Sequence, residues 1–131
     1  MSRNVKIQIE LKSPDDLNKL SLKISPIYVA YQPEARVIKA ILGISLSFPK
    51  TVYRYGYAQL EGEPSTSETF EYSLKDPKDL EMVKTDLASE AYKEFNQIKS
   101  EVLALLKYTN NVTVDLNEIL NRIVQKKRPT G

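Results

Sequence analysis

The stretch "DPKDLEMVKTDLASEAYKEFNQIKSEVLALLK", residues 76–107, decides the fold. Its apolar residues recur every three or four positions, which is the spacing of one face of an α-helix. That face comprises Leu80, Val83, Leu87, Ala91, Phe95, Ile98, Val102 and Leu105. Asp76 can cap this helix, and Pro77 suits the first helical position. We therefore predict one helix from Pro77 to about Lys107, which would be about 45 Å long.

Before residue 76, apolar and polar residues alternate instead, and this period of two is typical of half-buried β-strands. The clearest strand runs from Val37 to Phe48, and shorter alternating stretches lie at residues 5–11 and 69–74. The segment "IYVAY" lies between Pro26 and Pro33. Because proline cannot donate to a sheet ladder, we predict that this segment is an extended edge strand.

After the long helix, "NNVTVDLNEILNRIVQ" (residues 110–125) starts extended and becomes helical, with Asp115 and Glu118 at the spacing of a capping box. Residues 1–75 are therefore mainly β, residues 76–126 are helical, and residues 127–131 form a frayed basic tail. Strands followed by helices predict a single α+β domain spanning residues 1–131. We expect an antiparallel sheet of about four strands, covered by the long helix and a short last helix.

The stretch "TVYRYGYAQLEGE", residues 51–63, places Tyr53, Tyr55 and Tyr57 at alternate positions. We predict that Thr51–Gly62 forms a strand that pairs with Val37–Phe48 in a hairpin turning at Pro49 and Lys50, with a polar loop after it. In that register the three tyrosines share a face with Leu42, Ile44 and Leu46, and aromatic–aliphatic pairs of this kind stabilise a sheet. We therefore expect the tyrosines to lie under the long helix or in a subunit interface.

The opposite face of this expected hairpin is the candidate partner-binding surface. It is apolar but small, and its paired glycines would allow a partner to approach closely. Its members are Ile41, Gly43, Val52, Arg54, Gly56, Ala58 and Leu60. An alternative site is a base-stacking face made by Tyr53, Tyr55 and Tyr57. The basic tail, Lys126, Lys127 and Arg128, either caps the end of its own helix or contacts an acidic partner.

The composition lacks the residue types on which most catalytic and metal-binding sites depend. The chain of 131 residues contains neither histidine nor cysteine, so the usual general base, metal ligands and thiol nucleophile are missing. Its glycines form no phosphate-binding pattern, and Asp15 and Asp16 are better explained by a helix start than by a metal site. We expect no enzyme activity, no metal and no cofactor.

Charge and hydropathy limit the kinds of partner and the cellular location that we expect. The formal net charge is +2, which is too mild to indicate nucleic acid by itself. The N-terminus becomes charged too early for a signal peptide, and no run approaches the roughly 18 apolar residues of a membrane span. We expect a cytoplasmic protein, or one in the host cytoplasm if it is viral, with no membrane contact.

The order of elements resembles the SecB family of export chaperones. The resemblance is carried by the C-terminal third, where "NNVTVDLNEILNRIVQ" is similar to the ending of those proteins, an extended apolar stretch that leads into an amphipathic helix. SecB proteins are typically acidic and have a proline before that helix, whereas this chain is slightly basic and has Val114 and Asp115 there. The resemblance implies an oligomer that binds non-native polypeptide along apolar grooves.

Two main functional classes and one rival remain open at this point. The first is a non-catalytic protein-binding module that is chaperone-like and homo-oligomeric, and the second is a phage or viral assembly protein or host inhibitor. The rival is a protein that binds single-stranded nucleic acid through the tyrosine face. Because a bare strand edge invites another chain, we expect a protein partner and self-association through the sheet.

Overall fold

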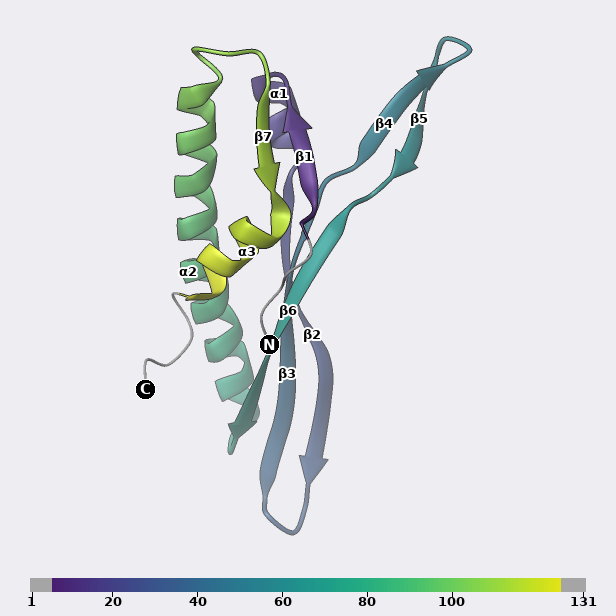
Figure 1. Cartoon of the computed structure of the whole chain (residues 1–131). Coiled ribbons are helices and arrows are strands. Elements are labelled where there is room, and N and C mark those ends of the chain that lie inside the picture. The colour runs from purple at the N-terminus through teal and green to yellow at the C-terminus, as the bar shows by residue number, and fades with distance from the viewer. Residues whose placement is uncertain (1–5, 126–131) are drawn as a thin grey trace.

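A computed structural model describes residues 6–125 of the chain, except for the side chains of residues 51–54 and 58–61. It is an α+β structure in which helices cover one face of an antiparallel sheet (Figure 1), as the sequence predicted. In chain order the elements are β1 (Gln8–Leu11), α1 (Pro14–Asn18), β2 (Ser21–Gln32), β3 (Val37–Ser47), β4 (Lys50–Arg54), β5 (Tyr57–Gly62), β6 (Ser65–Leu74), α2 (Pro77–Leu105), β7 (Val112–Asp115) and α3 (Leu116–Gln125).

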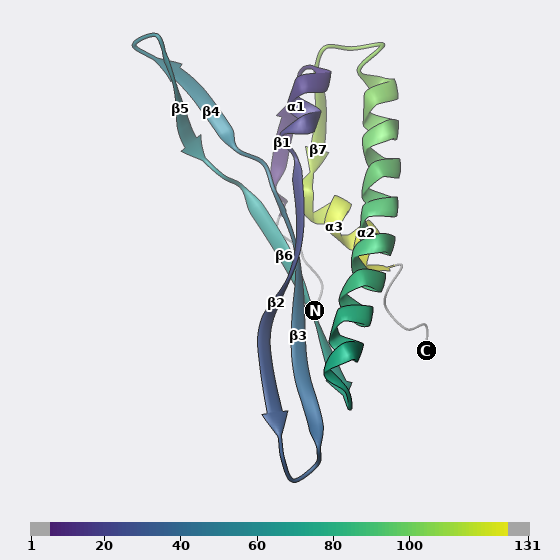
Figure 2. The ribbon, with the colours of Figure 1, turned by 180° about the vertical axis from the view of Figure 1, so that it is seen from behind.

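The central sheet has the strand order β2-β3-β6, and both pairings are antiparallel. Two smaller ladders accompany it, β1 with β7 and β4 with β5. The β1–β7 ladder lies on the same side as α2 and α3, as both ribbon views show (Figure 2). The strand β2 is an edge of the central sheet, so the prediction of an extended edge segment between Pro26 and Pro33 is confirmed.

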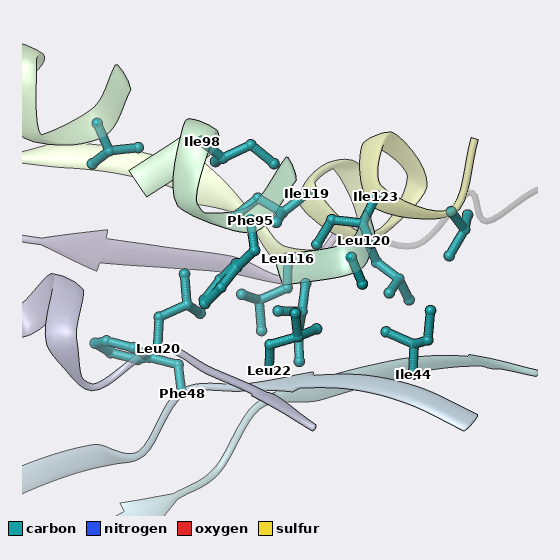
Figure 3. Close-up of a cluster of buried hydrophobic side chains, with 14 of the residues drawn as sticks. Leu20, Leu22, Ile44, Phe48, Phe95, Ile98, Leu116, Ile119, Leu120 and Ile123 are labelled. Atoms are coloured by element: carbon teal, nitrogen blue, oxygen red, sulfur yellow. The ribbon is translucent and has the colours of Figure 1, made fainter. Parts of the chain in front are cut away.

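The core lies between the central sheet and the two C-terminal helices (Figure 3). On β3 the alternate residues Ala40, Leu42, Ile44 and Leu46 are fully buried, which is the stripe that the sequence predicted. The helix α2 contributes Leu87, Ala91, Phe95, Ile98 and Val102 from its predicted apolar face, and α3 adds Leu116, Ile119, Leu120, Ile123 and Val124. The apolar stripe of β3, which has a period of two, and the apolar face of α2, which has helical spacing, therefore bury each other.

Side chains fix where the helices start. Asp76 accepts a hydrogen bond from the Lys78 amide at 2.9 Å, so the predicted cap of α2 is confirmed. Ser13 caps α1 in the same way, through the Asp16 amide. Asp115 accepts hydrogen bonds from the Asn117 amide and from the Ile7 amide, each at 3.0 Å. The last carboxylate therefore caps α3 and also ties it to the N-terminal strand.

The predicted hairpin turn at Pro49 and Lys50 is wrong. The chain instead continues from β3 into β4 and turns at Tyr55 and Gly56, so that β4 pairs with β5 and β3 pairs with β6. Both turn residues have positive φ, 54° and 81°, and this conformation suits a tight two-residue hairpin turn. Residues 37–74 thus form one long bent hairpin, with Pro49 and Pro64 at the bend. β6 begins at Ser65, inside the stretch predicted to be a polar loop.

Candidate protein-binding edge

The outer edge of β2 carries a run of exposed large apolar side chains. Ile27, Tyr28, Val29 and Tyr31 are 62%, 56%, 50% and 64% exposed, and together we call them the β2 patch. No other strand in residues 6–125 pairs with this side of β2. The β2–β3 hairpin also extends past the N-terminal end of α2 (Figures 1 and 2), so the helix does not cover its tip. The β2 patch therefore combines bare backbone with apolar side chains.

A bulge distributes the β2 patch over both faces of the sheet. The register of β2 against β3 shifts between Pro26 and Tyr28, which leaves Ile27 as the extra residue. Beyond the bulge, Val29 lies opposite the buried Ala40 and so shares the helix-covered face, whereas Tyr28 lies opposite Ile41 on the open face. An added strand would find apolar contacts on both faces of this edge.

The two edges of the central sheet differ in charge. Between Lys23 and Glu34, β2 and its following turn contain no charged residue. The opposite edge strand, β6, carries Glu68 and Glu71, and Glu71 lies 3.6 Å from Lys39 of β3. Charged side chains protect sheet edges against pairing with other chains. By this criterion β6 is protected and the distal half of β2 is not.

The predicted seven-residue partner surface is not assembled. Ile41 and Gly43 lie on β3, whereas the other five positions belong to the separate β4–β5 hairpin, which projects away from the body of the molecule (Figures 1 and 2). Gly43 pairs with Ser25 and Thr69 and not with Gly56. A Cβ at Gly43 would lie 2.5 Å from the Ile27 Cδ1, so the space that we assigned to a partner is filled by the chain's own bulge residue. The predicted pairing of glycines is therefore wrong.

The tyrosines of "YRYGY" do not lie under the long helix. Tyr55 is 94% exposed and Tyr57 is 73% exposed, because the hairpin that carries them stands clear of α2. Tyr53 lies on β4 opposite Ala58, and its side chain is outside the described part of the structure. The basic tail, Lys126, Lys127 and Arg128, also lies outside the described residues.

An ion-pair cluster joins α3 to α2. Arg122 donates to the Glu94 carboxylate at 2.6 Å and to both oxygens of Glu101 at 2.7 and 2.8 Å. The hydrogen bonds from Arg122, followed by one from Gln97, lower the pKa of Glu101 to about 2. The same hydrogen bonds raise the pKa of Arg122 above its ordinary value. One guanidinium of α3 holds two carboxylates of α2, so the role of this cluster is structural.

One hollow of the surface, of about 690 Å³, lies beside the end of β2 opposite to the β2 patch and has a mixed, charged lining. It is at the base of the β4–β5 hairpin, where Lys12, Lys19 and Lys50 are interspersed with Glu10 and Asp16. Asp16 already accepts a hydrogen bond from the Lys12 amide and pairs with Lys19. Among the side chains that the structure describes, no group of three or more acidic, histidine or cysteine residues lies close enough to hold a metal ion.

The sequence contains a signal for the β2 patch, although none of its residues is among the predicted partner-binding residues. The prolines that flank "IYVAY" predict an edge strand. Five consecutive residues without charge or strong polarity on an edge strand are already an exposed apolar surface. What the sequence did not give was the position of α2, which leaves this half of the strand uncovered.

The chain matches no protein-family model, no curated protein and no solved structure. No helix in the described part of the chain is both long enough and apolar enough to cross a membrane.

Proposed function

We propose that this chain is a non-catalytic protein-binding module that accepts an extended polypeptide segment along the free edge of β2. The observation that carries the proposal is the β2 patch, a charge-free apolar run on a strand whose outer edge is unpaired. In this mode of recognition, main-chain hydrogen bonds to the edge give affinity, and side chains on alternate positions give selectivity. The bound segment would become a fourth strand of the central sheet.

The chemistry of the edge favours an apolar partner segment. Val29 and Tyr31 would contact it on the helix-covered face, and Tyr28 would contact it on the open face. Tyrosine suits such a role because its ring is apolar and its hydroxyl can remain hydrated. Because the edge has no charge between Lys23 and Glu34, binding should depend only weakly on salt.

Two forms of this function remain candidates. A SecB-like chaperone would bind many non-native segments, because backbone pairing tolerates sequence, and the order of elements supports this form. A phage or viral assembly protein or inhibitor would instead bind one fixed partner. Affinity for unrelated unfolded chains distinguishes the chaperone from the dedicated partner.

The test is the binding of a fluorescently labelled, permanently unfolded model protein, followed by anisotropy. The variant Val29→Lys/Tyr31→Lys places two charges on the edge, the means by which natural edge strands avoid pairing. We expect it to weaken binding at least about tenfold, which is roughly 1.4 kcal/mol. The matched control is Met82→Lys, which adds a charge at a side chain that is likewise exposed, at 62%, but belongs to α2 and not to the edge strand. Equal affinity of the wild type and the double variant would remove the β2 patch as the binding surface.

A second candidate function rests on the β4–β5 hairpin. Tyr55 and Tyr57 are exposed at its tip and could stack on bases. Salt distinguishes this candidate, since phosphate contacts weaken steeply as ionic strength rises. Anisotropy with a labelled single-stranded oligonucleotide supports it if affinity falls steeply with salt and is reduced in Tyr57→Ala. Absence of binding at low salt rejects it.

A further inference from the structure

We propose that the strand added at the edge of β2 is β2 of a second copy of this chain, antiparallel about a two-fold axis at Ala30. This inference rests on the proposed function and names the partner at the same edge, so an unfolded chain binds there only by displacing the second copy. Ala30 of each copy lies opposite Ala30 of the other, Val29 lies opposite Tyr31, and Tyr28 lies opposite Gln32. The two central sheets become one six-stranded sheet.

Symmetry restricts the register to a few choices. A two-fold axis makes the residue pairs on its two sides identical. Neighbouring pairs of an antiparallel ladder are never identical, because hydrogen-bonded and non-hydrogen-bonded pairs alternate, so the axis cannot lie between two neighbouring pairs. The axis must therefore pass through a residue that lies opposite itself. The bulge at Pro26 and the turn that starts at Pro33 leave Tyr28, Val29 and Ala30 as candidates for that residue.

The bulge decides among the three candidates. An axis at Tyr28 or at Val29 would bring Ile27 into the ladder, but Ile27 is the extra residue of the bulge and its side chain lies against Gly43. An axis at Ala30 uses only Tyr28 to Gln32, where the register against β3 is regular. The smallest side chain of the segment then lies on the axis, where it faces its own copy directly.

The side-chain pairs formed in this register are favourable on both faces. On the helix-covered face, Val29 meets Tyr31 twice, and β-branched residues paired with aromatic residues stabilise antiparallel sheets. On the open face, the Tyr28 hydroxyl can meet the Gln32 amide. Lys23 and Glu34, the nearest charges along the chain, lie outside the ladder, so no like charges face each other across it.

The flank of α2 nearest to β2 extends the contact surface. Tyr92 donates a hydrogen bond to the Leu22 carbonyl at 2.7 Å, which identifies this flank as the one turned towards β2. The same flank carries a shallow groove of about 390 Å³, lined by Glu81, Lys84, Thr85, Ala88, Ser89 and Tyr92. A specific interface buries about 800 Å² on each partner, which exceeds what a five-residue ladder supplies by itself. The groove, with one acidic and one basic side chain, offers the additional area.

Cysteine cross-linking tests the axis, because the chain has no cysteine of its own. In Ala30→Cys the two Cα atoms would be about 4.5–5.5 Å apart, which is within the range of a disulfide. Gln32→Cys is the matched control, since its two copies would be separated by four residues along the strand, roughly 13 Å. Mild oxidation followed by a non-reducing gel should give dimer for Ala30→Cys and less than about one tenth as much for Gln32→Cys.

Light scattering of the wild type completes the test. At about 100 μM we expect a mass twice that of the 14.9 kDa chain, at low and at high salt alike, and a monomer mass for Val29→Lys/Tyr31→Lys. Cross-linking of Val29→Cys in preference to Ala30→Cys would overturn the proposed axis. A monomeric wild type that still binds unfolded protein through the β2 patch would overturn the second copy as partner and leave the proposed function standing. A monomer whose binding is insensitive to Val29→Lys/Tyr31→Lys would overturn both.

Discussion

Replacing Leu87 with alanine measures how far α2 stabilises the sheet. Leu87 is fully buried at the centre of the apolar face of α2. The substitution removes three carbons from the core, and their transfer to water costs about 2.4 kcal/mol at about 0.8 kcal/mol per methylene group. The cavity left behind adds to this cost, so that Leu→Ala at buried sites costs about 2–5 kcal/mol in total. We expect Leu87→Ala to lower the free energy of unfolding by about 3–4 kcal/mol.

The same helix supplies a matched control. Leu103 is 41% exposed, so Leu103→Ala makes the same chemical change at a half-open site. It should cost less than about 1.5 kcal/mol, because less apolar surface is removed from the interior. The assay is urea unfolding of both variants, followed by circular dichroism at 222 nm, with the slope m checked for constancy. A cost below about 1 kcal/mol for Leu87→Ala, or equal costs for the two variants, would refute the packing of α2 against the sheet.

Two further perturbations test the ion-pair cluster and the hairpin turn. Because Arg122 lowers the pKa of Glu101 to about 2, this carboxylate stabilises the fold fully above its unfolded pKa of about 4.3, and the stabilisation is lost as the pH falls towards 2. Glu101→Gln should therefore have a lower urea midpoint than the wild type at pH 7, and the deficit should shrink below about pH 4; a deficit that does not depend on pH would contradict the ion pair. Gly56→Ala forces a side chain into a positive-φ turn, at a cost of roughly 1–2 kcal/mol. Since the hairpin stands away from the core, hydrogen exchange should quicken in residues 50–62 and not in α2, and an unchanged exchange rate there would exclude the turn.

The helices were predictable from the sequence because each signal is local. The spacing of Leu87, Ala91 and Phe95 identifies a buried helical face without any knowledge of what it packs against. The caps at Asp76 and Asp115 depend on residues at most two positions away, apart from the added hydrogen bond from the Ile7 amide. Local patterns of this kind do not depend on which elements pack together, and they are sufficient to predict an α+β fold with a long and a short C-terminal helix.

Strand pairing was not predictable in the same way. Residues 51–62 alternate as one strand would, and nothing in a period of two shows that a strand reverses in its middle. The dipeptide Tyr55–Gly56 is a weak turn signal, because the first turn position favours asparagine, aspartate or glycine. The sequence predicts the turn at Pro49, whereas in the structure this proline marks a bend in a longer hairpin. Because the predicted strand pairing is wrong, the surface predicted from it to bind a partner does not form.

The contrast between the two sheet edges also limits how large an assembly can be. An apolar edge that pairs with any strand would lead to open-ended aggregation if both edges behaved alike. Here β6 carries Glu68 and Glu71 and is backed on its inner face by α3, where Thr66 donates a hydrogen bond to Asn117. Within the central sheet of the described residues, the edge of β2 is the one left to pair. Once two copies have joined through β2, each central sheet presents only its charged edge, so the pair closes at this sheet and does not extend into a fibre through it. An exposed apolar strand is then compatible with a well-defined dimer.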